Sequence, residues 1–106
     1  MKPLVVLTTI GETDDAAELA TVLVERRLVA CVNVIDSVRS IYRWEGRVND
    51  DREQLLIMKT TDARVDELRE AVLAIHPYEV PEFVVLPIEG ISEGYRDWLI
   101  AACAVG

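Results

Sequence analysis

The order strand, helix, strand occurs twice along this chain, and no other feature of the sequence limits its fold as much. In the first half, the apolar run at residues 4–7 predicts a strand buried on both faces, and residues 8–15 predict a loop. Apolar residues then recur at helical spacing over residues 16–24, where Asp14 and Asp15 complement the start of the helix. A second strand is expected within residues 29–38, so the first half predicts a βαβ unit.

The second half repeats this order. Residues 55–59 predict a strand, and Thr61 or Asp62 is the expected N-cap of a helix that ends before a proline at residue 77. Residues 82–88 predict the last strand of the second unit. A terminal helix capped by Ser92 should follow, and its expected inward side chains are Tyr95, Trp98, Leu99 and Ala102.

A hairpin joins the two units. Residues 40–47 predict its tip, with Glu45 and Gly46 as the turn. The acidic run at residues 49–53 could attract hard cations, but it lacks the alternating ligands of an EF-hand loop. We therefore expect this run to form a solvated bend.

Two βαβ units with right-handed crossovers predict an α+β fold of the ferredoxin-like, split βαβ type, with an extended hairpin and a C-terminal helix. A length of 106 residues suits one domain, spanning residues 1–106. Two helices would cover one face of the antiparallel sheet and leave the other face bare. Because 51% of the residues are hydrophobic, we expect this face to be buried between subunits.

Charge and composition exclude several classes of partner. The formal net charge is −8, so nucleic-acid phosphates and anionic lipids should be repelled. No apolar stretch reaches the length of about 20 residues that crosses a bilayer, and the first residues lack a signal-peptide cleavage site. Cys31 and Cys103 form no metal-binding or disulfide pattern, which favours two reduced thiols in a cytoplasmic protein.

Four segments together carry a family resemblance: residues 28–34 (LVACVNV), 40–46 (SIYRWEG), 76–82 (HPYEVPE) and 86–88 (LPI). In this order and spacing they resemble the CutA family of divalent-cation tolerance proteins. The resemblance implies a ferredoxin-like protomer in a tight homotrimer, cytoplasmic in bacteria and linked to tolerance of copper and other divalent metals. It attaches no reaction to the chain, and kinship with the trimeric PII signalling proteins adds a regulatory analogy only.

Candidate metal ligands are Cys31, His76, Glu79 and Glu82, which supply a thiol, an imidazole and two carboxylates. They could meet the ligand count of a zinc or copper site, if necessary across a subunit boundary. For Cys31 the alternative is a small apolar residue of the core. For His76 it is a residue at the end of a helix, near the helix's last carbonyl groups.

Aromatic residues are the candidates for subunit contacts. Tyr42 and Trp44 lie at the hairpin tip, where exposed rings could clasp a second subunit. Tyr78 lies between two prolines that order the turn from helix to strand, and its phenol could line a pocket between subunits. An interface role is favoured over catalysis for this turn.

Three functional classes remain open. The leading hypothesis is a non-enzymatic, trimeric protein of metal response with no obligatory cofactor and with copper or another divalent cation as its ligand. The alternative is a PII-like sensor that binds a small molecule between subunits, using basic residues among Arg39, Arg43, Arg47 and Lys59. An acylphosphatase-like enzyme is disfavoured, because residues 8–15 offer no basic group to a phosphate.

Overall fold

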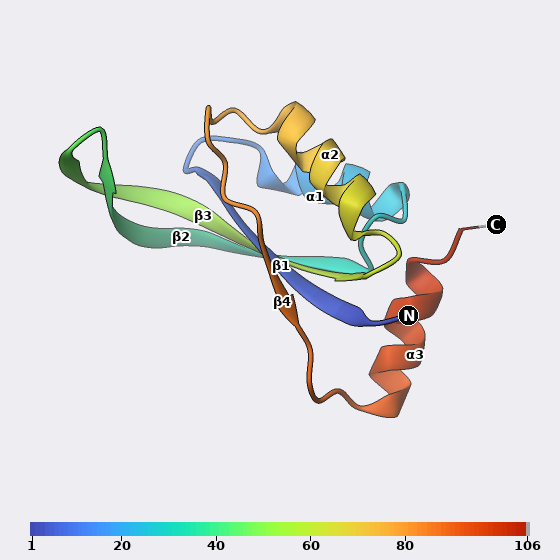
Figure 1. Ribbon diagram of the computed structural model, residues 1–106. Coiled ribbons are helices and arrows are strands. Elements are labelled where there is room, and N and C mark those ends of the chain that lie inside the picture. The colour runs from blue at the N-terminus through green and yellow to red at the C-terminus, as the bar shows by residue number, and fades with distance from the viewer. Residues whose placement is uncertain (106) are drawn as a thin grey trace.

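The structure is a computed structural model that describes residues 1–105. Its elements are β1 (Pro3–Gly11), α1 (Ala16–Glu25), β2 (Cys31–Trp44), β3 (Arg47–Thr61), α2 (Val65–Ile75), β4 (Val84–Pro87) and α3 (Glu93–Ala102). The strands form one antiparallel sheet in the order β2-β3-β1-β4 (Figure 1). The predicted ferredoxin-like α+β fold is therefore confirmed, together with its extended hairpin and its C-terminal helix.

Helices α1 and α2 lie side by side on one face of the sheet (Figure 1). The core between them is fully buried and contains Val6 and Met58 from the sheet, Leu23 from α1, and Leu68 and Val72 from α2. Burial alternates along β1, so the prediction of a strand covered on both faces was wrong. Helices cover only one face of the sheet, and successive side chains of a strand point to opposite faces.

Strand β1 is longer than the sequence pattern indicated. It continues through residues 8–11, which were expected to form a loop, and its last residue, Gly11, pairs with Glu53 of β3. Asp14 and Asp15 then begin α1 as expected. The Asp15 carboxylate accepts a hydrogen bond of 3.0 Å from the Glu18 amide, and Asp14 accepts one of 2.8 Å from the Gly11 amide.

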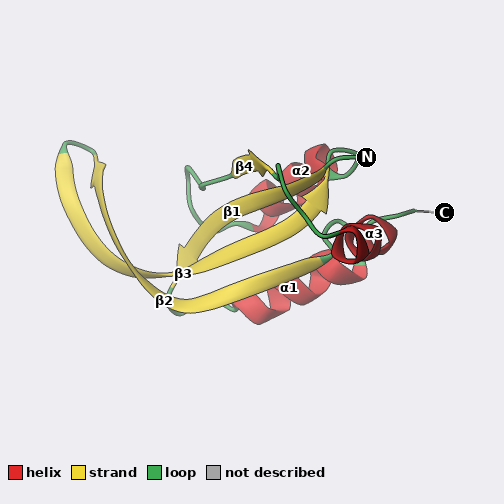
Figure 2. Cartoon of the chain, turned by 90° about the horizontal axis from the view of Figure 1, so that it is seen from below, coloured by secondary structure: helices red, strands yellow, loops and turns green. Residues whose placement is uncertain are grey.

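Strands β2 and β3 continue beyond the helices as a long two-stranded arm (Figures 1 and 2). The turn at Glu45 and Gly46 is confirmed, and both residues have positive φ angles, 50° and 76°. The predicted solvated bend at residues 49–53 was wrong, because these residues pair with β2 inside the arm. Arg39 holds Asp50 across the two strands through hydrogen bonds of 2.8 and 2.6 Å.

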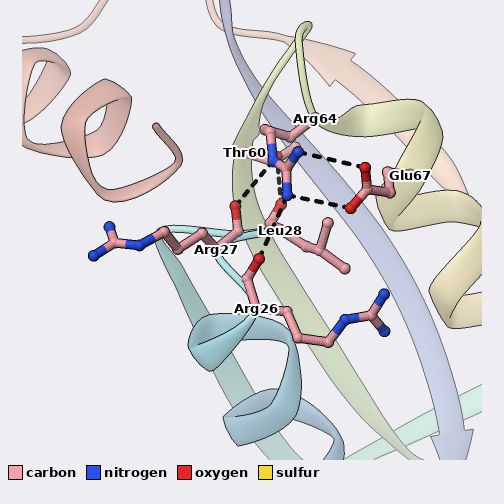
Figure 3. Close-up of polar contacts among 6 residues, drawn as sticks. All are labelled: Arg26, Arg27, Leu28, Thr60, Arg64 and Glu67. Carbon is pink, nitrogen blue, oxygen red and sulfur yellow. Dashed lines mark hydrogen bonds and ion pairs between the residues drawn. The ribbon is translucent and has the colours of Figure 1, made fainter. Parts of the chain in front are cut away.

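The end of α1 and the start of α2 are joined by one side chain. Arg64 is the N-cap residue of α2, and its guanidinium donates to the carbonyl oxygens of Arg26 and Arg27 and to Glu67 (Figure 3). The predicted N-caps at Thr61 and Asp62 were therefore wrong. Asp62 instead accepts a hydrogen bond of 2.8 Å from the Lys2 amide, which lowers its pKa.

Helix α3 lies at the end of the sheet near the chain's N-terminus (Figure 1). Ser92 occupies its N-cap position, but the hydroxyl makes no capping hydrogen bond. Leu99 is buried against Ala30, whereas Tyr95 and Trp98 are 41% and 48% exposed, contrary to the prediction that they point inward. The helix packs through one narrow stripe, which leaves the two rings uncovered. Within residues 1–105, none of the helices has the length and apolar character needed to cross a membrane.

Candidate functional site

A groove of about 670 Å³ lies between the hairpin arm and the segment that follows α2. Its wall on the arm contains Tyr42 and Trp44, and the facing segment contributes Tyr78, Glu79 and Glu82. All three predicted interface residues and two of the four predicted metal ligands therefore line one cavity. Its lining also includes Glu53, the last residue of the acidic run at residues 49–53.

Residues 76–82 contain no helix or strand, so side-chain contacts hold this segment in place. His76 ends α2 and is 8% exposed, with Nε2 2.7 Å from the Thr9 carbonyl oxygen. Its Nδ1 accepts a hydrogen bond of 3.1 Å from the Tyr78 amide. At the other end, the buried Thr8 hydroxyl donates a bond of 2.6 Å to the Glu82 carbonyl. These bonds fix one wall of the groove to β1.

Tyr78 and Glu53 meet at the floor of the groove. The phenol donates a hydrogen bond of 2.7 Å to Oε2 of Glu53, a carboxylate that is only 8% exposed. Burial, followed by the bond to Glu53, raises the pKa of Tyr78, so the phenol stays protonated and remains a donor. Among the described residues, Glu53 has no lysine, arginine or histidine nitrogen within 4.0 Å.

The arm supplies an aromatic wall. Tyr42 donates a hydrogen bond of 2.6 Å to Asp51, and this bond raises the pKa of its phenol. Trp44 is 43% exposed and Ile41 is 65% exposed. The cavity therefore combines apolar and aromatic surface with carboxylates. None of the described residues that line it is a lysine, arginine or histidine.

The four predicted metal ligands are separated within one chain. Cys31 lies level with Val5 of β1, because both residues pair with Lys59 of β3. The His76 ring instead contacts Thr9, which lies four residues further along β1. Four residues of strand correspond to about 13 Å. Within residues 1–105, no three His, Cys, Asp or Glu side chains converge as a metal site would require.

Cys31 and His76 occupy defined structural positions. The Cys31 sulfur is half-buried and lies 3.7 Å from the Tyr95 hydroxyl, so this residue is not part of the apolar core. His76 has both ring nitrogens engaged within the chain, and the carbonyl that its Nε2 contacts belongs to Thr9 of β1, not to the end of α2. Ligation by His76 would require it to release one of these two hydrogen bonds.

The sequence interpretation missed Thr8, and it considered Glu53 only as the end of an acidic run expected to form a solvated bend. The spacing of Glu53, Leu55 and Ile57 follows the two-residue period of a strand and could have indicated that β3 begins earlier. No local pattern marks Thr8, because its partner carbonyl at Glu82 lies 74 residues away.

Comparison with known proteins gives consistent results. A family model described as CutA1 divalent ion tolerance protein matches residues 4–102. The divalent-cation tolerance protein CutA of Thermus thermophilus is 50% identical over 95 residues, which cover 90% of this chain and 92% of that protein. The chloroplastic CutA of Arabidopsis thaliana is 43% identical over 91% of this chain, which spans 53% of that longer relative.

Solved structures show the same backbone. The structure of the Thermus thermophilus protein matches with a TM-score of 0.91 and 46% identity, covering 96% of this chain and 99% of that one. The PII-like protein CutA of Nostoc sp. PCC 7120 matches with a TM-score of 0.88 and 34% identity over 98% of each chain. The chain therefore belongs to the CutA1 family of divalent ion tolerance proteins.

Proposed function

We propose that this protein is a cytoplasmic homotrimer that binds cations without catalysing a reaction, as part of the cell's tolerance of divalent ions. Buried Glu53 carries the binding part of this proposal, because a carboxylate withdrawn from water is normally paired with a positive charge. Glu79 and Glu82 add two further negative charges to the same groove.

Exposed apolar side chains support assembly into an oligomer. The sheet face opposite the helices and the arm together expose Ile35, Ile41, Trp44, Val84 and Leu86, each by more than 40%. Surfaces of this kind on a small protein mark contacts with other chains. The outer strands β2 and β4 also leave backbone groups free to pair with a second copy.

The proposed copper or divalent-metal site would be shared between copies. Cys31 lies far along the sheet from Glu79 and Glu82, so a site containing all three needs residues of two subunits. A thiolate favours Cu(I), whereas carboxylates and imidazole suit Zn(II) and Cu(II). His76 would join such a site only after leaving its contact with Thr9 or Tyr78.

The absence of catalysis is proposed from the site's chemistry. A serine or cysteine nucleophile is commonly activated by an adjacent base. The described contacts of the His76 ring go to two backbone groups, and the described contact of Cys31 goes to the Tyr95 hydroxyl. Neither arrangement activates a nucleophile.

A small-molecule sensor of the PII-like type is the second candidate, and the groove favours it. Its volume of about 670 Å³ lies within the range of small-molecule sites. The basic residues expected to hold a nucleotide do not line the groove. Arg39 bonds Asp50 and Lys59 bonds Asn33, so this cavity offers no cation to a phosphate.

Native mass spectrometry of the protein with Cu(I), Cu(II) or Zn(II) tests the proposal. We expect a trimer that takes up metal, with uptake lost in Cys31→Ser and in Glu79→Gln/Glu82→Gln. The control is Glu89→Gln, an exposed carboxylate outside the groove, which should bind as the parent does. A monomeric mass would contradict the proposed trimer. Metal uptake that is unchanged in both variants would contradict the proposed ligands.

A further inference from the structure

We infer that the groove binds a small organic cation, an ammonium or guanidinium group attached to an apolar body, with Glu53 as its counter-ion. This inference rests on the cation-binding role proposed above and names the class of ligand. The inference is built from the charge, geometry and lining of the groove.

Glu53 provides the anchoring charge. Its single described hydrogen bond, from Tyr78, ends on Oε2, and no described residue donates to Oε1. As a residue, Glu53 is 8% exposed, and it lines the groove, so a ligand in the cavity lies beside its carboxylate. A ligand N–H there would supply the missing donor and the missing positive charge.

A bare metal ion fits this cavity less well than an organic cation does. Calcium requires six to eight oxygen ligands and zinc about four, and no three acidic, cysteine or histidine side chains converge among residues 1–105. An ammonium or guanidinium group needs only one carboxylate at hydrogen-bonding distance. The remaining surface of such a ligand can be apolar.

The walls match such a ligand. Tyr42, Trp44 and Tyr78 line the same cavity, and aromatic faces attract organic cations. Ile41 and Val80 add aliphatic surface for the body of the molecule. Anionic ligands are disfavoured, because Glu53, Glu79 and Glu82 would repel them and no basic side chain among the described lining residues compensates.

A guanidinium from a second copy is the competing occupant. Arg43 and Arg47 lie at the hairpin tip, next to its turn, and neither makes an ion pair among the described residues. The lining favours a free ligand, since Ile41, Trp44 and Val80 offer apolar surface to the body of the molecule beyond the guanidinium contact with Glu53. The experiment separates the two sources.

Isothermal titration of the protein with 2-phenylethylamine and 2-phenylethylguanidine tests the inference. Neutral 2-phenylethanol and anionic 3-phenylpropionate are the matched control ligands. We expect saturable binding of the two cations and at least tenfold weaker binding of both controls. Equal binding of 2-phenylethanol would overturn the inference, because the site would then select an apolar body without regard to charge.

Variants locate the site. Glu53→Gln should weaken binding of the cations at least tenfold. Glu53→Asp keeps the negative charge and should retain most of the binding affinity. Glu89→Gln is the control for a general loss of negative charge. Thermal melting of each variant shows whether it is folded, and Val80→Lys, which adds an ammonium group at the exposed lining of the groove, gives a second variant that should weaken binding if Glu53→Gln fails to fold. Unchanged affinity in folded Glu53→Gln would overturn the inference.

Three outcomes separate this inference from the competing occupant and from the proposed function. If the parent protein binds no amine but Arg43→Gln/Arg47→Gln does, a second copy's guanidinium fills the groove and the free-ligand inference is wrong. If the amines bind but native mass spectrometry detects no metal, the inference stands and the proposed metal site fails. Metal uptake that is unaffected by Glu53→Gln would show that the two sites are separate.

Discussion

The Tyr78 phenol donates a 2.7 Å hydrogen bond to the buried Glu53 carboxylate, and this contact joins the segment after α2 to the base of the hairpin arm. Both residues line the groove. The hydrogen bond therefore also orients the carboxylate of Glu53, which is the only buried charged residue among the described lining residues. Tyr78 thus holds in place the carboxylate that we propose as the binding group.

Tyrosine ionisation should depend on these contacts. The pKa values of all three tyrosines are raised, that of Tyr78 by burial and then by Glu53, and that of Tyr42 first by its bond to Asp51. An unfolded phenol ionises near pH 10, whereas the folded phenol stays protonated. The contribution of Tyr78 to stability is therefore fully present below about pH 10 and is lost as the pH rises further.

Ultraviolet titration of tyrosinate checks this prediction. No tyrosine should titrate at its ordinary pKa in the folded protein, and Tyr78→Phe should melt with a smaller loss of stability above pH 10 than the parent. A tyrosine that titrates near pH 10 in Tyr42→Phe/Tyr95→Phe would contradict the assignment for Tyr78.

Replacing Arg27 by glycine should stabilise the fold. Arg27 follows the C-cap of α1 with φ of 58°, and the amides of Arg27 and Leu28 bond back to Val24 and Leu23. This is the Schellman arrangement, in which glycine is favoured because it carries no Cβ. We expect Arg27→Gly to raise the free energy of unfolding by about 0.5–1 kcal/mol in urea denaturation.

Arg26→Gly is the matched control. Its φ is −79°, a conformation that arginine adopts without strain, so glycine there should destabilise the protein. If both variants lower stability equally, strain at residue 27 is absent.

The hydroxyl of Thr8 should control the groove's wall. Thr8→Val removes the donor to the Glu82 carbonyl, and the loss of a buried hydrogen bond costs about 1–3 kcal/mol. Thr60→Val removes a buried bond of 2.7 Å to the Leu28 carbonyl, four residues along β3 from Leu56, the partner of Thr8 in the sheet. Both variants should lose stability, but only Thr8→Val should speed hydrogen exchange at residues 78–83. Equal exchange there in the two variants would show that the bond does not hold the segment.

Trp44 should contribute to the proposed trimer. Trp44→Ala removes an exposed ring of the arm, and we expect it to weaken each subunit contact by about 2 kcal/mol, the scale of a central interface tryptophan. Light scattering on dilution measures this effect. Leu73→Ala, on the exposed face of α2, is the control and should leave the mass unchanged. An undiminished trimer in Trp44→Ala would place the contact elsewhere.

Local patterns in the sequence determined most of the fold. The repeated βαβ order, the helical spacing and the Glu45–Gly46 turn each depend on residues within a few positions of one another, and the structure has all three. The same patterns erred at element ends. Residues 49–53 are polar and resemble a bend, but pairing with β2 makes them strand. Tyr95 and Trp98 have the spacing of buried helix residues, but both rings are exposed in this chain.

The sequence by itself determined the family, the sheet, and a segment of residues 76–82 ordered by two prolines. Only the tertiary structure decided which of these residues form the groove. It buried Glu53 beneath Tyr78, which is 25 residues away, and it separated Cys31 from the carboxylates expected beside it. The physical reason is that burial and charge pairing depend on groups brought together by the folded chain, and no pattern of neighbouring residues specifies them.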